Sequence, residues 1–271
     1  DNIVDPDCWI EPEKKEWKIQ LNQQLETVAT TAAFVVGDMN EDGFPDIVAY
    51  GISNRSSIKI FWGPDFTSVK EITGVGADSN TTLAIAKVKI SDTPSEQYES
   101  FICYRSGSTV RALRADGTSP WSVNPNSRYP GMIGVADFNG DGWSEVYLGN
   151  QIYDAATGTL LCDGGTAENS GTTLVVLSNA AQPVAIDILG DSDLELVAGN
   201  KIYKVDIDRN TSTPKSLTLL SSVSPPTGCL DDGLTVVADF DNDGKLEVLV
   251  RRRNNNTGGS RPIHLYLWTP H

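Results

Sequence analysis

The sequence has little of what zinc sites and nucleophilic enzymes depend on. It contains only two histidines, His264 and His271, and its four cysteines form no CxxC pair. A zinc site is therefore not predicted, because it needs closely spaced Cys and His ligands. A Ser-His-Asp or Cys-His arrangement is poorly supported, since no GxSxG motif is present and both histidines lie near the end of the sequence. A phosphate-binding glycine loop is also missing.

Long apolar runs and helical patterns are missing as well. No apolar run approaches 18 residues, so no membrane span is predicted. No stretch of ten or more residues has a convincing helical period. The four cysteines, Cys8, Cys103, Cys162 and Cys229, fit either one or two disulfides in an exported protein or buried free thiols. The sequence lacks an initiator methionine, and we expect a mature or excised piece whose signal peptide is not in view.

Acidic residues outnumber basic residues, and many of the acidic residues lie in four short segments. The formal net charge is -15, and four nine-residue segments hold 15 of the 36 acidic residues (four, three, four and four). An acidic surface repels nucleic acid and anionic membranes, so neither is a predicted partner. We interpret much of this charge as a stock of metal ligands.

What the sequence does contain is a recurring acidic loop. The segment DFNGDGWSE, residues 137–145, has oxygen-bearing side chains at alternate positions, then a glycine, and an acid at position nine. Calcium takes six to eight oxygen ligands, and the glycine allows a sharp turn. DMNEDGFPD at 38–46 and DFDNDGKLE at 239–247 repeat the pattern. The predicted ligand side chains are Asp38, Asn40, Asp42 and Asp46; Asp137, Asn139, Asp141 and Glu145; and Asp239, Asp241, Asp243 and Glu247.

The spacing of the loops predicts a repeat of about 50 residues. A weaker copy, DILGDSDLE at 187–195, has Leu189 where an oxygen ligand belongs and Ser192 in place of the glycine, so no calcium is predicted there. The four loops begin at 38, 137, 187 and 239, and the first step is twice the others. A fifth repeat is therefore expected near Lys87, which stands where the first aspartate would be. We interpret it as a repeat that has lost its ion.

Each repeat is predicted to be a small antiparallel sheet. Runs of β-branched and aromatic residues enter and leave every loop, and a third and usually a fourth run follow. The predicted fold is all-β, a β-propeller of about five four-stranded blades with calcium loops between the first two strands of several blades. The repeats lie near 30–76, 80–125, 130–168, 180–224 and 232–271.

The two ends of the sequence are expected to meet. Residues 1–15 are predicted to be an irregular lead, and 16–271 a single domain. The fifth repeat ends after its third strand. Residues 16–21, EWKIQL, are the candidate for its fourth strand, paired near Leu265 to Leu267.

With these loops and strands, the chain resembles the FG-GAP or VCBS repeat family, the calcium-loop propellers of integrin α-subunit heads and of bacterial surface or secreted proteins. The resemblance implies about three structural Ca²⁺ ions and a backbone carbonyl ligand at position seven of each loop, from Phe44, Trp143 and Lys245. Family members usually have seven or eight blades. Five repeats therefore form either a small closed ring or part of a larger one.

The functional prediction is a non-enzymatic calcium-binding module of an exported protein, serving adhesion, glycan binding or scaffolding. The predicted location is extracellular or at the cell surface, with the periplasm as the alternative, and the module is expected to be a monomeric part of a larger chain. Its expected partner is a glycan or a surface protein. One alternative is a polysaccharide lyase or hydrolase acting on acidic polysaccharide, although no spacing identifies a catalytic base. The other is a spacer without a ligand.

Two further groups of residues have both a ligand-binding and a structural interpretation. Arg251, Arg252 and Arg253 form either a basic lip for an acidic glycan or a strand end that runs into a hairpin loop. Trp62, Trp121 and Trp143 are either platforms for sugar stacking or packing between blades.

Overall fold

The described part of the protein is built from β-strands alone. The computed structural model describes residues 34–51, 57–76, 83–106, 108–125, 132–164, 182–224, 234–253 and 263–270. Within these ranges the predicted all-β class is confirmed, and no helix is long and apolar enough to cross a membrane. The predicted lead at 1–15 and the predicted strand at 16–21 lie outside the described residues.

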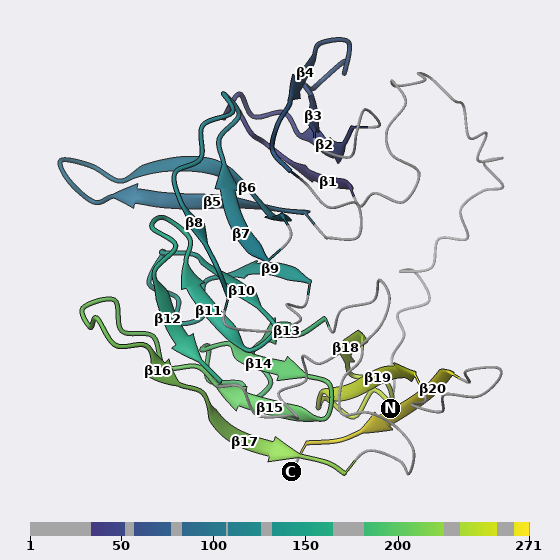
Figure 1. The fold of residues 1–271 in the computed structure, drawn as a ribbon. Helices are drawn as coiled ribbons and strands as arrows, with labels where there is room; N and C mark the ends of the chain where they lie inside the picture. Colours follow the sequence, from purple (N-terminus) through teal and green to yellow (C-terminus); the bar gives the residue numbers. More distant parts are fainter. Residues whose placement is uncertain are drawn as a thin grey trace, which may run out of the picture.

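Five sheets follow one another in chain order along a curved path (Figure 1). The first contains β1 (Phe34–Gly37), β2 (Asp46–Tyr50), β3 (Ile58–Phe61) and β4 (Val69–Ile72). The second contains β5 (Leu83–Ser91), β6 (Gln97–Ser106), β7 (Thr109–Leu113) and β8 (Ser122–Val123). The third contains β9 (Ile133–Ala136), β10 (Glu145–Leu148), β11 (Gln151–Asp154) and β12 (Leu160–Asp163). The fourth contains β13 (Val184–Ile186), β14 (Glu195–Ala198), β15 (Lys201–Lys204) and β17 (Thr218–Ser222). The fifth contains β18 (Leu234–Ala238), β19 (Glu247–Arg253) and β20 (Ile263–Trp268).

The strands given above pair antiparallel within each sheet, and the sheets pack face to face through their apolar residues. All four residues of β10 and all four of β14 are buried, which agrees with the largely apolar sequences of these strands. Side chains alternate between the two faces, so Val146 and Leu148 pack toward the second sheet while Tyr147 packs toward the fourth. Each of the four buried clusters draws on two consecutive sheets. The core is therefore divided among the junctions between sheets.

The first strands of the sheets also contact one another in chain order. β5 touches β1 and β9, and β13 touches β9 and β18. The predicted acidic loops connect the first strand of a sheet to its second, at 38–45, 137–144, 187–194 and 239–246. They consequently lie at equivalent places in the first, third, fourth and fifth sheets.

The second sheet replaces the acidic loop with a long hairpin. β5 and β6 continue past the point where the other sheets have a loop, and Lys87 is an exposed strand residue whose ammonium lies 5.5 Å from the Tyr98 ring centre. Further along, the buried Lys89 forms salt bridges with Asp92 and with Glu96, the latter at 2.9 Å. These carboxylates raise the pKa of Lys89. The repeat that the sequence predicts to be without an ion thus pairs its acids with an ammonium group.

A segment of the fourth repeat crosses to the third sheet. Between β15 and β17, residues 205–217 lie against β12 and add the short strand β16 (Lys215–Ser216), which pairs parallel with Cys162 and Asp163. The Cys162 thiol donates to the Asp206 carbonyl at 3.4 Å. We call residues 205–217 the bridging segment. It fastens the third sheet to the fourth.

Several candidates from the sequence serve packing instead. Trp121 is buried, and its indole N–H donates to the Ala155 carbonyl at 2.8 Å, so of its two interpretations the structure supports packing. Cys103 and Cys162 are buried free thiols, and burial raises the pKa of Cys103 to about 12 and that of Cys162 to about 11. Cys8 and Cys229 lie outside the described residues.

Candidate metal centres

The four acidic loops share one hydrogen-bonding pattern. In each, the aspartate at position one accepts the N–H groups of positions five and six, and the aspartate at position five accepts the N–H of position seven. In loop 239–247 these bonds measure 3.1, 2.9 and 2.8 Å. The weak copy at 187–195 keeps the complete pattern, and what it lacks is the oxygen at position three, where Leu189 is 58% exposed.

The backbone of all four loops turns through the left-handed region twice. Position four has φ values of 60°, 66°, 77° and 61° at Glu41, Gly140, Gly190 and Asn242. Position six has 87°, 83°, 80° and 87° at Gly43, Gly142, Ser192 and Gly244. Only glycine adopts such angles without steric cost. Ser192 therefore holds a strained conformation in the one loop that has lost the glycine.

The acid at position nine is buried and closes the loop from the inside. Asp46 and Glu145 are 0% exposed, Glu195 is 1% and Glu247 is 3% exposed. Each accepts the N–H of position two, over 2.8, 2.9, 3.1 and 2.8 Å in chain order. Asp46 also accepts the Gly63 N–H at 2.8 Å. This acid therefore has a structural role that does not depend on an ion.

Loop 187–195 allows the structural role of the position-nine acid to be tested apart from ion binding. We expect Glu195→Ala to cost about 1–3 kcal/mol in unfolding free energy, because the Ile188 N–H loses its acceptor. Asp191→Ala, at an exposed position, should change stability by less than about 0.5 kcal/mol. Both effects, measured by urea denaturation, should be the same with calcium and with EDTA. Glu195→Gln keeps an oxygen acceptor and is the control; an equal loss in Glu195→Gln would contradict the assignment.

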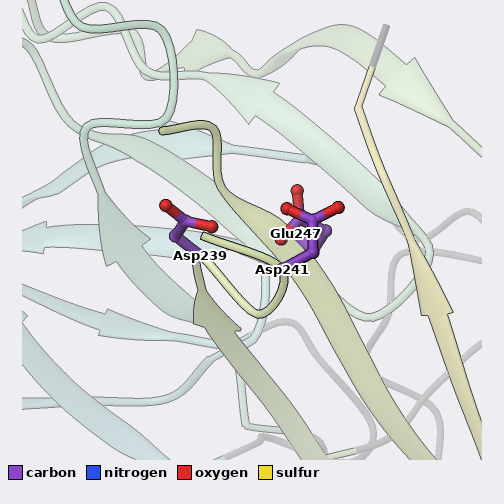
Figure 2. Close-up of side chains that lie close together, drawn as sticks. All are labelled: Asp239, Asp241 and Glu247. Atoms are coloured by element: carbon purple, nitrogen blue, oxygen red, sulfur yellow. The ribbon is translucent and has the colours of Figure 1, made fainter. Parts of the chain in front are cut away.

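Loop 239–247 brings its acidic groups together most closely. Ligand oxygens of Asp239, Asp241 and Glu247 lie within 4.8 Å of one another, the only such cluster of His, Cys, Asp or Glu side chains in the described ranges. Figure 2 shows Asp239 on one side of the loop and Asp241 beside Glu247 on the other. Asp243 is outside this trio. A set of carboxylate oxygens at this spacing fits a calcium ion, which prefers oxygen ligands.

Loop 38–46 has the same backbone with an amide at position three. The Asn40 amide donates to Asp42 at 2.9 Å, and its oxygen accepts the Asp42 N–H at 3.3 Å. Within the described ranges, no Lys or Arg forms a salt bridge with the acids of this loop or of loop 239–247. As far as the described residues go, both loops therefore gather negative charge without a side-chain counterion.

Loop 137–145 differs because an arginine occupies it. Arg209, from the bridging segment, contacts the carboxylates of Glu145 and Asp154, donates to the Trp143 carbonyl at 2.9 Å, and lies 3.5 Å from Asp141. Its guanidinium carbon is 5.6 Å from the Trp143 ring centre, and the Lys89 ammonium is 5.4 Å from the same ring. Two cations, one from the second repeat and one from the fourth, thus lie close to the Trp143 ring of the third repeat.

The burial of Glu145 explains why it needs a positive partner. Burial raises the pKa of Glu145 to about 8, while the Phe138 N–H and the Arg209 guanidinium oppose that rise. The neighbouring carboxylates of Asp141 and Asp137 add to it. A buried carboxylate is stable in its charged form only beside a cation or several hydrogen-bond donors.

The loops also connect consecutive sheets. Ser100 of β6 donates to the Asp38 carbonyl at 2.8 Å, and Ser144 donates to the Lys87 carbonyl of β5 at 3.1 Å. The Leu194 N–H of loop 187–195 donates to the Phe138 carbonyl of loop 137–145 at 2.8 Å. Fixing the conformation of one loop therefore also fixes the neighbouring sheet.

Sequence reasoning found the loop positions but missed Arg209. Side-chain oxygens at positions one, three and nine do converge in loop 239–247, whereas in loop 137–145 those at five and nine face an arginine. Arg209 lies 64 residues from Glu145 in a polar turn segment, and no local pattern links the two. Arg251 is exposed on β19, and β19 stays paired with β20 through Arg253. This agrees with the interpretation of the three arginines as a strand end. The side chains of Arg252 and Arg253 are outside the described part.

No family model and no curated protein matches the chain. Among solved structures, the chain is similar to the V. cholerae biofilm matrix protein Bap1, with a TM-score of 0.51 and 19% sequence identity. The match covers 84% of this chain and 35% of that protein, so the chain spans about a third of Bap1. At this identity the likeness is one of fold.

Proposed function

We propose that the chain is a calcium-stabilised β-propeller module of the FG-GAP or VCBS type, with an adhesion or scaffolding role in an extracellular or surface protein. The observation that carries the calcium part is the convergence of Asp239, Asp241 and Glu247. The contact of first strands in chain order supports the propeller, because blades of a propeller meet through their inner strands.

The ions are proposed to be structural. Loops 38–46 and 239–247 would hold calcium through their side chains at positions one, three, five and nine, with the carbonyls of Phe44 and Lys245. Calcium supplies positive charge that offsets the repulsion between these carboxylates. Because the first loop is hydrogen-bonded to the next sheet through Ser100, an ordered loop also orders a sheet junction.

The extracellular role is supported by the fold shared with a biofilm matrix protein. For this chain, we propose a glycan or a surface protein as the partner. A cleft beside loop 38–46, lined by Asn40, Glu99 and Arg114 among others, offers polar groups of both charges to such a ligand. Polar groups placed in a cleft are the usual means of fixing a ligand's orientation.

Binding and cleavage can be separated in one experiment. The purified chain is incubated in calcium with neutral and acidic polysaccharides, and both the protein and the products are chromatographed. We expect retention of the protein on at least one polysaccharide and no new oligosaccharides. The Asp239→Asn/Asp241→Asn variant should bind more weakly after mild heating. New oligosaccharides would replace the proposal by a lyase or hydrolase, and the absence of both binding and cleavage would favour a protein partner or a spacer.

A further inference from the structure

Arg209 contacts the same oxygens that an ion in loop 137–145 would need. The resemblance assigns positions five, seven and nine as ligands, and the guanidinium lies against all three: the Asp141 carboxylate at 3.5 Å, the Trp143 carbonyl at 2.9 Å and the buried Glu145 carboxylate. A calcium ion would have to share these oxygens with a second cation at close range. Like charges at such distances repel strongly where water is scarce.

The arginine is held in place by the fold. Its side chain is only 18% exposed, it also pairs with Asp154 of β11, and its guanidinium carbon lies 5.6 Å from the Trp143 ring centre. The bridging segment around it is fixed by the pairing of Lys215 with Cys162 and by the bond from the Cys162 thiol to the Asp206 carbonyl. A freely moving surface arginine would have none of these restraints.

We propose that Arg209 takes the place of an ion in loop 137–145. The chain then binds calcium in loops 38–46 and 239–247 but not in loop 137–145. This inference rests on the proposed calcium binding, and it proposes two ions where the family resemblance implies about three. The residues of loop 137–145 therefore do not fit calcium in the wild-type chain, although their spacing matches the motif.

The test counts bound calcium by equilibrium dialysis and elemental analysis, with folding checked by circular dichroism. We expect two ions in the wild type and three in Arg209→Gln, which removes the positive charge. Lys215→Gln is the matched control, because Lys215 lies in the same bridging segment and also pairs with an acid (Asp206, at 2.9 Å), yet within the described ranges it forms no salt bridge with an acid of the loops. It should bind two ions.

A second measurement does not depend on the folding of Arg209→Gln. In the otherwise wild-type chain, Asp137→Asn should leave the count at two, whereas Asp239→Asn should lower it to one. Terbium gives a site-specific signal, because loop 137–145, with Trp143, is the only one of the three loops with a complete motif that has a tryptophan at position seven. Tryptophan-sensitised terbium emission should rise in Arg209→Gln, and Trp143→Phe should abolish that rise.

The outcomes separate the inference from the proposed function. Three ions in the wild type, falling to two with Asp137→Asn, would overturn the role of Arg209 and leave the calcium module intact. An unchanged count of two in a folded Arg209→Gln would also overturn it. No bound calcium in any variant would overturn the proposed function itself.

Discussion

Removal of calcium is expected to lower the melting temperature of the chain by roughly 10–20 °C. An ion that binds only the folded form adds about 2.7 kcal/mol at a hundredfold excess over its Kd, so two ions add about 5 kcal/mol. For a chain of this size, 1 kcal/mol corresponds to roughly 2–4 °C. Differential scanning calorimetry in 1 mM calcium and in EDTA measures the difference.

Two variants show whether the loss comes from the proposed loops. Asp239→Asn/Asp241→Asn should respond to EDTA about half as strongly, because one of two ions is already gone. Asp191→Asn, in the loop that lacks a position-three oxygen, should respond like the wild type. A melting temperature that EDTA leaves unchanged would contradict structural calcium in this chain.

In EDTA, Arg209→Gln is expected to lose about 3 kcal/mol of unfolding free energy. Removing one partner of a fully buried ion pair costs about 3–5 kcal/mol, because the remaining charge has no compensation. The Arg209 side chain is 18% exposed while that of Glu145 is 0% exposed, so we expect the lower end of that range. Urea denaturation measures the change.

The control is Arg114→Gln. The Arg114 and Glu99 side chains are 37% and 36% exposed, and such pairs contribute at most about 1 kcal/mol. In saturating calcium, the deficit of Arg209→Gln should shrink by about 2–3 kcal/mol as an ion enters the vacated loop. A deficit that calcium does not reduce would mean that the arginine and the ion are not interchangeable.

Much of the strand arrangement could be predicted because the information is local. The apolar runs after each loop, such as residues 146–148, are buried on both faces and became the second strands of the sheets. The spacing of the loops also located the repeat that has no acidic loop. The ion pairs of that repeat were not predictable, because the sequence marked only Lys87, at the place of the first aspartate, whereas Lys89 forms the pairs.

The features that could not be predicted depend on contacts between distant residues. The bridging segment contains a two-residue parallel strand, too short to have a periodic pattern, and polar turn residues surround it. The second role of Glu145, as acceptor of the Phe138 N–H, also cannot be distinguished from metal ligation by its spacing. The bridging segment and the hydrogen bond from Phe138 to Glu145 both depend on contacts that form only in the folded chain.

The bridging segment joins the third and fourth repeats into one structural unit. Because β16 pairs with β12, a fragment that ends between β12 and β13 would expose the edge of β12 and lose the guanidinium beside Glu145. Domain shuffling, or the engineering of shorter modules, should therefore move these two repeats together, with a boundary after β17.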